Sequence, residues 1–222
     1  MGVLYLVRHG QAPAHAYAAE PVAADAPGLT DLGFVQARHT GLELARQVPE
    51  FTATVSGALP RQQATLTGVM EAFEGAPDPL VDPGWDEYTI PALPGAPTTE
   101  MYTNPAAYQQ MLDAALARWT AGAEHGGESY ADYIARMNAA AGRAVDLAGS
   151  GQTVLVVSSA GTITALLARL WGVPPEQWPI MARAMVNASI TKLLVGRRGL
   201  TVVSMNEHGH LSARDVGLAT FR

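Results

Sequence analysis

The chain has 222 residues, of which 48% are hydrophobic and 15% are charged, and its formal net charge is −6. This composition excludes an intrinsically disordered chain and is sufficient for one hydrophobic core. No basic run is longer than Arg197-Arg198, so we expect no nucleic-acid partner bound through its phosphates. The sequence holds no cysteine, which excludes disulfides and thiolate chemistry.

The N-terminal residues do not resemble a targeting segment. Residues 1–7 are apolar but short, and they lack a basic leader and a cleavage site, so we expect a strand there. No stretch reaches the roughly 20 apolar residues that span a bilayer. We therefore expect a cytoplasmic protein without membrane contact.

The first predicted strand covers residues 3–7, a fully apolar run that is typical of the centre of a covered sheet. Residues 12–28 are rich in Ala, Pro and Gly and are expected to form a loop. Thr30-Asp31 then predicts the start of a helix, which Pro49 ends.

A second short strand is predicted over residues 51–56, and a helix over 59–73 carries Pro60 near its first turn, where proline is tolerated. The proline-rich stretch of about 74–105 follows. It is too long for a simple connection, so we expect a substrate-binding or lid excursion with little regular structure.

In the second half of the chain, Thr-Val-Leu-Val-Val-Ser over residues 153–158 is the clearest strand pattern. Residues 189–195 and 200–206 alternate like the paired strands of a hairpin around 196–199. The remaining predicted helices cover residues 108–121, 129–148, 161–171 and 175–184.

This order of elements predicts an α/β fold, a three-layer α-β-α sandwich whose central sheet is mostly parallel with an antiparallel edge strand. We expect one domain over residues 1–222. Ligands of such sheets bind beyond the carboxyl ends of the strands, where Arg8-His9 and Ser158-Ser159 lie. The antiparallel edge after Ser189 could also pair between two copies, which makes a homodimer a candidate assembly.

Arg8-His9-Gly10 combines three residue types that suit phosphate chemistry. Arginine offers a planar fork of donors that matches phosphate oxygens. Histidine can act as a nucleophile or base near neutral pH, and glycine lets the backbone approach a ligand closely. Because the tripeptide follows an N-terminal apolar strand, we interpret it as part of a functional site.

The segment Leu6-Val7-Arg8-His9-Gly10-Gln11 resembles the signature of the histidine phosphatase superfamily, also called the phosphoglycerate mutase-like family. Further resemblances follow in chain order over nearly the whole sequence. Residues 29–37 resemble the family motif L-T-x-x-G-x-x-Q-A, and residues 56–65 resemble S-S-P-L-x-R-A-x-Q-T. Residues 127–129 with Arg136 resemble the G-E-S helix start, and residues 154–161 resemble V-V-S-H-G-G. Residues 187–190 and 206–211 resemble the closing strands of the family.

The resemblance implies a phosphomonoester hydrolase that transfers a phosphoryl group to His9 and then to water. By position, Arg8 and Arg61 would bind the phosphate, and the start of the helix that carries Arg61 would add attraction for an anion. The partner would be a small phosphorylated substrate or phosphate. A phosphoglycerate-type mutase is the less favoured activity, because residues 12–17 hold no Asn to position a second phosphate.

The family also uses a carboxyl group as the proton donor to the leaving oxygen, and Trp85-Asp86-Glu87-Tyr88 lies where that group is expected. Glu87 is our choice, Asp86 is the alternative, and Asp82 is a weaker candidate. A carboxyl acid must hold its proton to serve, so we expect burial to raise the pKa of this group.

The main departure from the family pattern is Ser159, which stands where the family has a second histidine. A hydroxyl donates one hydrogen bond without a positive charge, and this loss is worth about 1–2 kcal/mol, or about one decade of rate or affinity. The N–H groups of Ala160 and Gly161 could assist at the phosphate. The alternative function is therefore a degenerate member that binds a phosphorylated metabolite or a protein partner with little or no turnover.

Two further residues are candidates for substrate contact, Gln11 and His15. His39 is expected on a helix surface, and His208 and His210 are expected to be structural. No histidine spacing fits a metal site, and we see no phosphate-binding loop or carboxylate cluster, so we expect neither a metal nor another cofactor.

Overall fold

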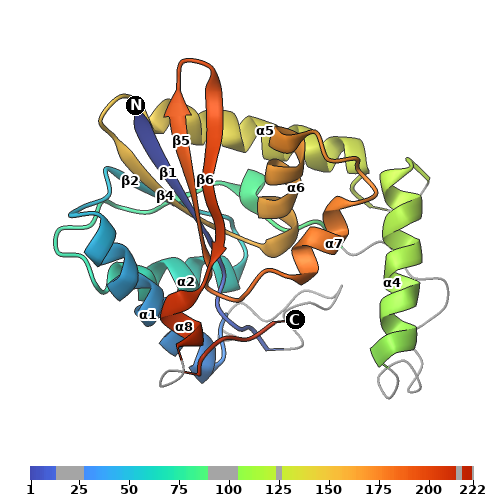
Figure 1. The fold of residues 1–222 in the computed structure, drawn as a ribbon, viewed down its shortest axis with the longest axis horizontal. Coiled ribbons are helices and arrows are strands. Elements are labelled where there is room, and N and C mark those ends of the chain that lie inside the picture. The colour runs from blue at the N-terminus through green and yellow to red at the C-terminus, as the bar shows by residue number, and fades with distance from the viewer. Residues whose placement is uncertain (14–27, 90–104, 124–126, 214–216, 222) are drawn as a thin grey trace.

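The structure is a computed structural model that describes residues 1–13, 28–89, 105–123, 127–213 and 217–221. Its centre is a six-stranded sheet in the order β3-β2-β4-β1-β5-β6 (Figure 1). The first four strands in this order run parallel, β5 is antiparallel to β1, and β6 is antiparallel to β5. The strands are β1 (Gly2–Arg8), β2 (Ala53–Ser56), β3 (Leu80–Val81), β4 (Thr153–Ser158), β5 (Ile190–Gly196) and β6 (Gly199–Glu207).

Helices cover both faces of the sheet, which confirms the predicted three-layer α/β architecture (Figure 1). One face carries α1 (Asp31–Gln47) and α2 (Pro60–Met70), and the other carries α5 (Tyr130–Leu147), α6 (Ala160–Trp171) and α7 (Trp178–Arg183). The described residues also form the 3-10 helix η2 (Pro83–Trp85), α4 (Pro105–Thr120) and α8 (Gly209–Ser212). An ion pair between Arg183 and Asp113 links α7 to α4, which stands at the margin of the molecule.

The burial of β1 explains why its sequence is apolar without interruption. Leu4 and Leu6 pack into the core beneath α5 and α6, whereas Tyr5 and Val7 pack into the core beneath α1 and α2. Successive side chains of a strand point to opposite faces, so a strand covered on both sides needs apolar residues at every position. This central position places the end of β1 inside the molecule.

Local capping explains where two of the predicted helices begin. The side chain of Thr30 accepts a hydrogen bond from the N–H of Gly33 at 3.0 Å. In the same way, the side chain of Ser129 accepts one from the backbone N–H of Asp132 at 3.0 Å. Such caps satisfy a helical N–H that has no partner within the helix. Both starts therefore lie where the sequence predicts them.

The proline-rich excursion begins with short elements that pattern analysis did not single out. Leu80–Val81 forms the edge strand β3, and η2 follows it directly. Residues 90–104, which the sequence analysis assigned to the excursion, lie outside the described residues, as does most of the loop over 12–28. None of the helices in the described residues combines the length and the apolar composition that a membrane span requires.

Candidate active site

His9 follows β1 directly, and only 2% of its surface is exposed. Its N–H donates to the carbonyl of Ser158 at the end of β4, at 2.9 Å. Its carbonyl accepts from the side chain of Asn187 and from the N–H of Ala188, both at 3.2 Å. The backbone of His9 is therefore held between β4 and the segment before β5.

A hydrogen bond fixes which ring nitrogen of His9 carries the proton. Nδ1 lies 2.7 Å from the carbonyl oxygen of Gly10. A carbonyl can only accept, so Nδ1 is the donor, and Nε2 of the neutral ring bears the lone pair. Nε2 is consequently the atom that can attack an electrophile.

Two glycines allow the chain after His9 to approach the start of α1. A Cβ on Gly10 would lie 2.6 Å from the carbonyl oxygen of Gly33, and a Cβ on Gly33 would lie 2.1 Å from that of Gln11. Neither contact is tolerable, so this approach requires glycine at both positions. The Gln11 side chain accepts from the hydroxyl of Thr30 at 2.8 Å, which anchors it to the helix start. The other predicted substrate contact, His15, lies outside the described residues.

Arg8 and Arg61 are both almost fully buried beside the carboxyl group of Glu87. Arg8 donates to the carbonyl of Met185, and Arg61 lies in the first turn of α2. Both guanidinium groups act to lower the pKa of Glu87, so their positive charges lie near its carboxylate. The sheet thus brings two cations, the histidine His9 and a carboxyl group together beyond the ends of β1 and β4.

The pKa of Glu87 lies above its ordinary value because burial outweighs the groups that favour its charged form. Those groups are the N–H of Gly161, the charge of Arg61, the N–H of Tyr88 and the charge of Arg8. Oε2 of Glu87 accepts from the backbone N–H of Gly161 at 2.9 Å, and Oε1 accepts from the backbone N–H of Tyr88 at 3.2 Å. A carboxyl group that retains its proton to higher pH is suited to donate it to a leaving oxygen.

Asp86, the alternative proton donor, is engaged in capping α2. One carboxylate oxygen accepts from the N–H of Ala58 at 2.6 Å and from that of Leu59 at 3.3 Å. Burial raises the pKa of Asp86 as well, against the opposing effect of these hydrogen bonds. Asp86 therefore binds the backbone at the start of α2, whereas Glu87 binds the backbone at the start of α6.

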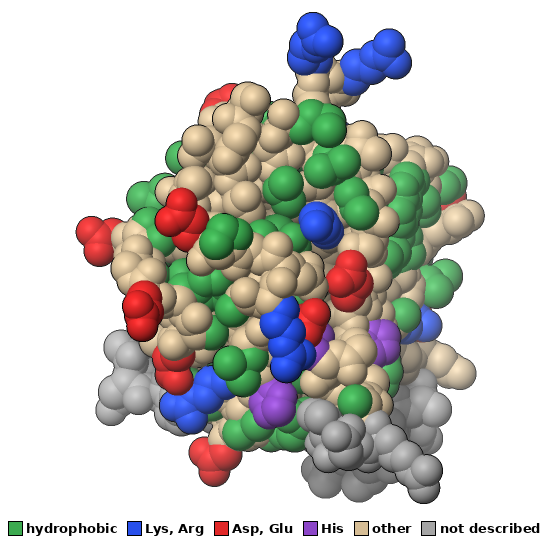
Figure 2. Space-filling view, turned by 60° about the vertical axis from the view of Figure 1, so that its left-hand side comes forward, with side chains coloured by type: hydrophobic (Ala, Val, Ile, Leu, Met, Phe, Trp, Pro, Cys, Tyr) green, Lys and Arg blue, Asp and Glu red, His purple; other side chains and the backbone are tan. Residues whose placement is uncertain are grey.

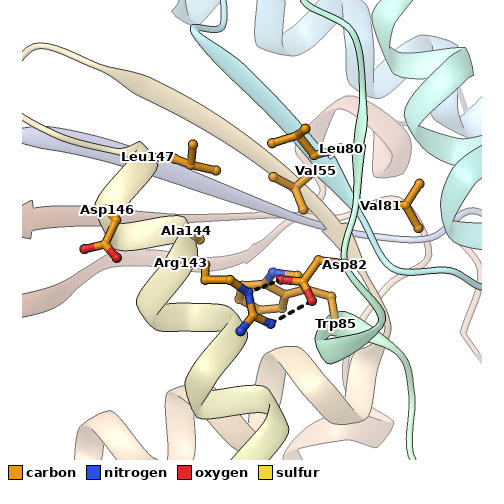
Figure 3. A pocket seen from close by; sticks show the side chains of 9 residues that line it. All are labelled: Val55, Leu80, Val81, Asp82, Trp85, Arg143, Ala144, Asp146 and Leu147. Carbon is orange, nitrogen blue, oxygen red and sulfur yellow. Dashed lines mark hydrogen bonds and ion pairs between the residues drawn. The ribbon is translucent and has the colours of Figure 1, made fainter.

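Asp82, the weaker candidate, lies at the edge of the sheet (Figure 3). It accepts from the N–H of Gly84 at 2.9 Å and forms an ion pair with Arg143 at 2.8 Å. Burial raises the pKa of Asp82, but these contacts outweigh it and the pKa is lower than usual. These contacts favour the charged form of Asp82, so it is less suited than Glu87 to donate a proton.

The Asp82–Arg143 ion pair borders a groove of about 610 Å³ between β2, β3 and α5 (Figure 3). The walls of the groove are largely apolar. It does not include Arg8, His9, Arg61 or Glu87, so it is separate from the candidate site. The lining residues are Val55, Leu80, Val81, Asp82, Trp85, Arg143, Ala144, Asp146 and Leu147.

Arg136 holds the segment that carries Glu87. Its guanidinium donates to the carbonyls of Asp86 at 2.8 Å, of Gly84 at 3.2 Å and of Glu87 at 3.2 Å. An ion pair with Glu128 fixes the guanidinium in turn. The G-E-S motif, which sequence reasoning treated as a helix start, thus also supports the carboxyl group of the site.

Ser159 is fully buried at the N-cap position of α6, and Ala160 is the first residue of that helix. The Ser159 hydroxyl oxygen accepts from the side-chain amide of Gln62 at 3.0 Å. The N–H of Gly161, which was considered for phosphate binding, donates to Glu87. Sequence reasoning did not single out Gln62, because its role depends on a residue that is distant in the chain.

Thr65 is a second supporting residue that sequence reasoning did not identify. Its hydroxyl accepts from the N–H of Gly10 at 2.9 Å and donates to the carbonyl of Arg61 at 2.7 Å. The hydroxyl therefore links the backbone after His9 to α2. Its spacing of four residues from Arg61 on a helix is the signal that could have pointed to it.

The other described histidines lie apart from this site. His210 bonds the hydroxyl of Thr40 at 2.9 Å, and burial lowers the pKa of its ring. The ring of His208 bonds the carbonyl of Asn206 at 2.5 Å. Histidine side chains gather on the lower part of the face in Figure 2, where acidic and basic groups are intermixed. Among the described residues, no group of three or more His, Cys, Asp or Glu could hold a metal.

Replacing Glu87 with Gln is expected to make stability less dependent on pH. Because the folded pKa lies above the ordinary value of 4.5, the folded chain keeps this proton where the unfolded chain has lost it. As pH rises through that window, the wild type should lose unfolding free energy relative to Glu87→Gln. Denaturant titrations between about pH 4 and pH 8 measure the difference. A difference that stays constant with pH would contradict the raised pKa.

The chain matches the histidine phosphatase superfamily (branch 1) over residues 4–208. A search of curated proteins found no match. Mycobacterial hydrolase 1 is 26% identical with a TM-score of 0.66, over 93% of this chain and 98% of that one. The mycobacterial glucosyl-3-phosphoglycerate phosphatase is 25% identical with a TM-score of 0.65, over 93% and 99%. Bacillus stearothermophilus YhfR has the same fold, with 22% identity and a TM-score of 0.71, over 94% and 98%.

Proposed function

This chain belongs to branch 1 of the histidine phosphatase superfamily, and on that basis we propose that it hydrolyses phosphate monoesters through a phosphohistidine at His9. The proposal rests on the groups that come together beyond the ends of β1 and β4. Nε2 of His9 bears a lone pair, Arg8 and Arg61 supply positive charge, and Glu87 has a raised pKa. These are the groups that phosphoryl transfer requires.

In the first step, Nε2 of His9 attacks phosphorus, so that a P–N bond forms as the bond to the leaving oxygen breaks. Glu87 gives its proton to that oxygen, and the alcohol departs. In the second step, Glu87 takes a proton from water, which attacks phosphorus, breaks the P–N bond and releases phosphate. Arg8 and Arg61 hold the phosphoryl oxygens in both steps.

The proposed substrate is a small phosphorylated metabolite. Two solved relatives guide the choice of test compounds, the glucosyl-3-phosphoglycerate phosphatase and a phosphoserine phosphatase from Entamoeba histolytica, which was also solved with 3-phosphoglyceric acid. The loops expected to contact the rest of the substrate fall largely outside the described residues.

Phosphate release by the purified chain tests this function. We expect hydrolysis of p-nitrophenyl phosphate and faster turnover of at least one of phosphoserine, 3-phosphoglycerate or glucosyl-3-phosphoglycerate. Orthovanadate should inhibit competitively, because it imitates the five-coordinate phosphorus of the transfer step. Absence of release from every compound would contradict the proposed hydrolase.

Ser159 favours a second candidate function, a phosphate-binding member with little turnover. We propose that this residue replaces a charged donor of the family with a neutral hydroxyl. Calorimetry that detects binding of the phosphate esters, combined with no phosphate release, would support the second function over the first.

The double variant Gln62→Ala/Ser159→His is expected to raise kcat/KM by about tenfold over Gln62→Ala alone, because a charged donor returns to the site. The first substitution provides space, since both side chains are fully buried and in contact. Steady-state kinetics with p-nitrophenyl phosphate measures the gain. Equal activity of the two variants would show that the missing charge does not limit the enzyme.

A further inference from the structure

Gln62 connects three parts of the site although no part of its surface is exposed. Its amide nitrogen donates to the hydroxyl oxygen of Ser159 and to the carbonyl of Trp85, both at 3.0 Å. Its amide oxygen accepts from the N–H of Leu59 at 3.3 Å. Gln62 thus joins the start of α2, which carries Arg61, to the segment before Glu87 and to the start of α6.

These partners fix the orientation of the amide. The carbonyl of Trp85 can only accept, and the N–H of Leu59 can only donate, so the nitrogen of Gln62 must face Trp85 and Ser159. The two amide protons then point to these two acceptors. As a result, the Ser159 oxygen receives a hydrogen bond from Gln62 and keeps its own proton for another acceptor.

We propose that Gln62 is a positioning residue that makes Ser159 a hydrogen-bond donor to the phosphoryl oxygens at His9. The inference rests on the phosphoryl site proposed above. Ser159 lies next to Ser158, whose carbonyl binds the N–H of His9 at 2.9 Å. Because the amide occupies the acceptor side of the hydroxyl, the proton of Ser159 is directed to an incoming anion before the substrate binds.

The other partners of Gln62 allow this role to be separated from a structural one. The carbonyl of Trp85 also accepts from the hydroxyl of Ser158 at 2.6 Å. The N–H of Leu59 also donates to Asp86 at 3.3 Å. Loss of the amide therefore leaves each of these backbone groups with a partner, and the hydroxyl of Ser159 is the group that loses its orienting contact.

A double-mutant cycle tests the proposal with Gln62→Met, which keeps the length of the side chain and removes its hydrogen bonds. We expect Ser159→Ala to lower kcat/KM for p-nitrophenyl phosphate by about tenfold and Gln62→Met to lower it by about fivefold. The double variant should fall by about tenfold, because Gln62 acts through Ser159. Gln63→Met, an exposed neighbour on the same helix, should leave kcat/KM unchanged.

Three results would overturn the proposal. The first is Ser159→Ala with wild-type activity. The second is a double variant that falls by about fiftyfold, the product of the single effects, because independent contributions multiply. The third is a loss of kcat/KM in Gln62→Met that accompanies a lower midpoint of denaturation and that also occurs in Gln63→Met.

The same cycle can be measured without turnover, which separates this proposal from the proposed function. Calorimetric titration of each variant with inorganic phosphate reports the donor of Ser159 directly. We expect its dissociation constant to rise by about tenfold for Ser159→Ala, by about fivefold for Gln62→Met and by about tenfold for the double variant. If the wild type shows no turnover but this pattern of dissociation constants is observed, the proposed hydrolase activity is wrong and the positioning role of Gln62 is supported. If phosphate affinity does not change, the positioning role fails.

Discussion

His9→Ala is expected to lower phosphate release by about 10⁴-fold or more, because the substitution removes the atom that forms the covalent intermediate. The residual rate would come from Arg8, Arg61 and Glu87, which can still bind and polarise the ester. In the proposed mechanism Nε2 is the reacting atom, because Nδ1 donates to the carbonyl of Gly10 at 2.7 Å. Initial rates with p-nitrophenyl phosphate measure the loss.

The phosphoenzyme itself provides the stricter test of His9. Brief incubation with a ³²P-labelled ester, followed by denaturation in alkali, should retain label in the wild type. The label should be lost in acid, because P–N bonds are acid-labile, and it should be absent from His9→Ala. His39→Ala, a partly exposed histidine of α1, is the matched control. Equal hydrolysis by wild type and His9→Ala would show that the nucleophile is assigned wrongly.

Glu87→Gln is expected to slow hydrolysis in proportion to the difficulty of the leaving group. An alkyl phosphate such as phosphoserine needs a proton on its departing oxygen, so its kcat should fall by about 10²- to 10³-fold. A 2,4-dinitrophenyl ester leaves as a stable anion, and its kcat should fall by less than about tenfold. The slope of log kcat against the pKa of the leaving group measures this difference.

Asp86→Asn is the matched control for Glu87, because its side-chain oxygen can still accept from Ala58. We expect this variant to show no added dependence on the leaving group. A steeper slope for Asp86→Asn than for Glu87→Gln would transfer the proton-donor role to Asp86. In the wild type, turnover of alkyl phosphates should fall as pH rises through the raised pKa of Glu87, since the acid form is then lost.

The sequence by itself was enough to predict the α/β fold and the order of its main helices and strands. Apolar alternation, helix caps such as Thr30 and Ser129, and breakers such as Pro49 act over a few residues, so they can be read from the chain. The position of Arg8-His9 could also be predicted, because the pair follows a buried strand and ligands of such sheets bind beyond the carboxyl ends of the strands.

The tertiary structure decided which side chains at that edge meet and which carboxyl group is available. Asp82, Asp86 and Glu87 are near neighbours in sequence, yet one pairs with Arg143, one caps α2 and one contacts the start of α6. The contact of Gln62 with Ser159 spans 97 positions of the chain. Hydrogen-bond partners so far apart, and the burial that raises the pKa of Glu87, depend on how the helices pack on the sheet, which no local pattern encodes.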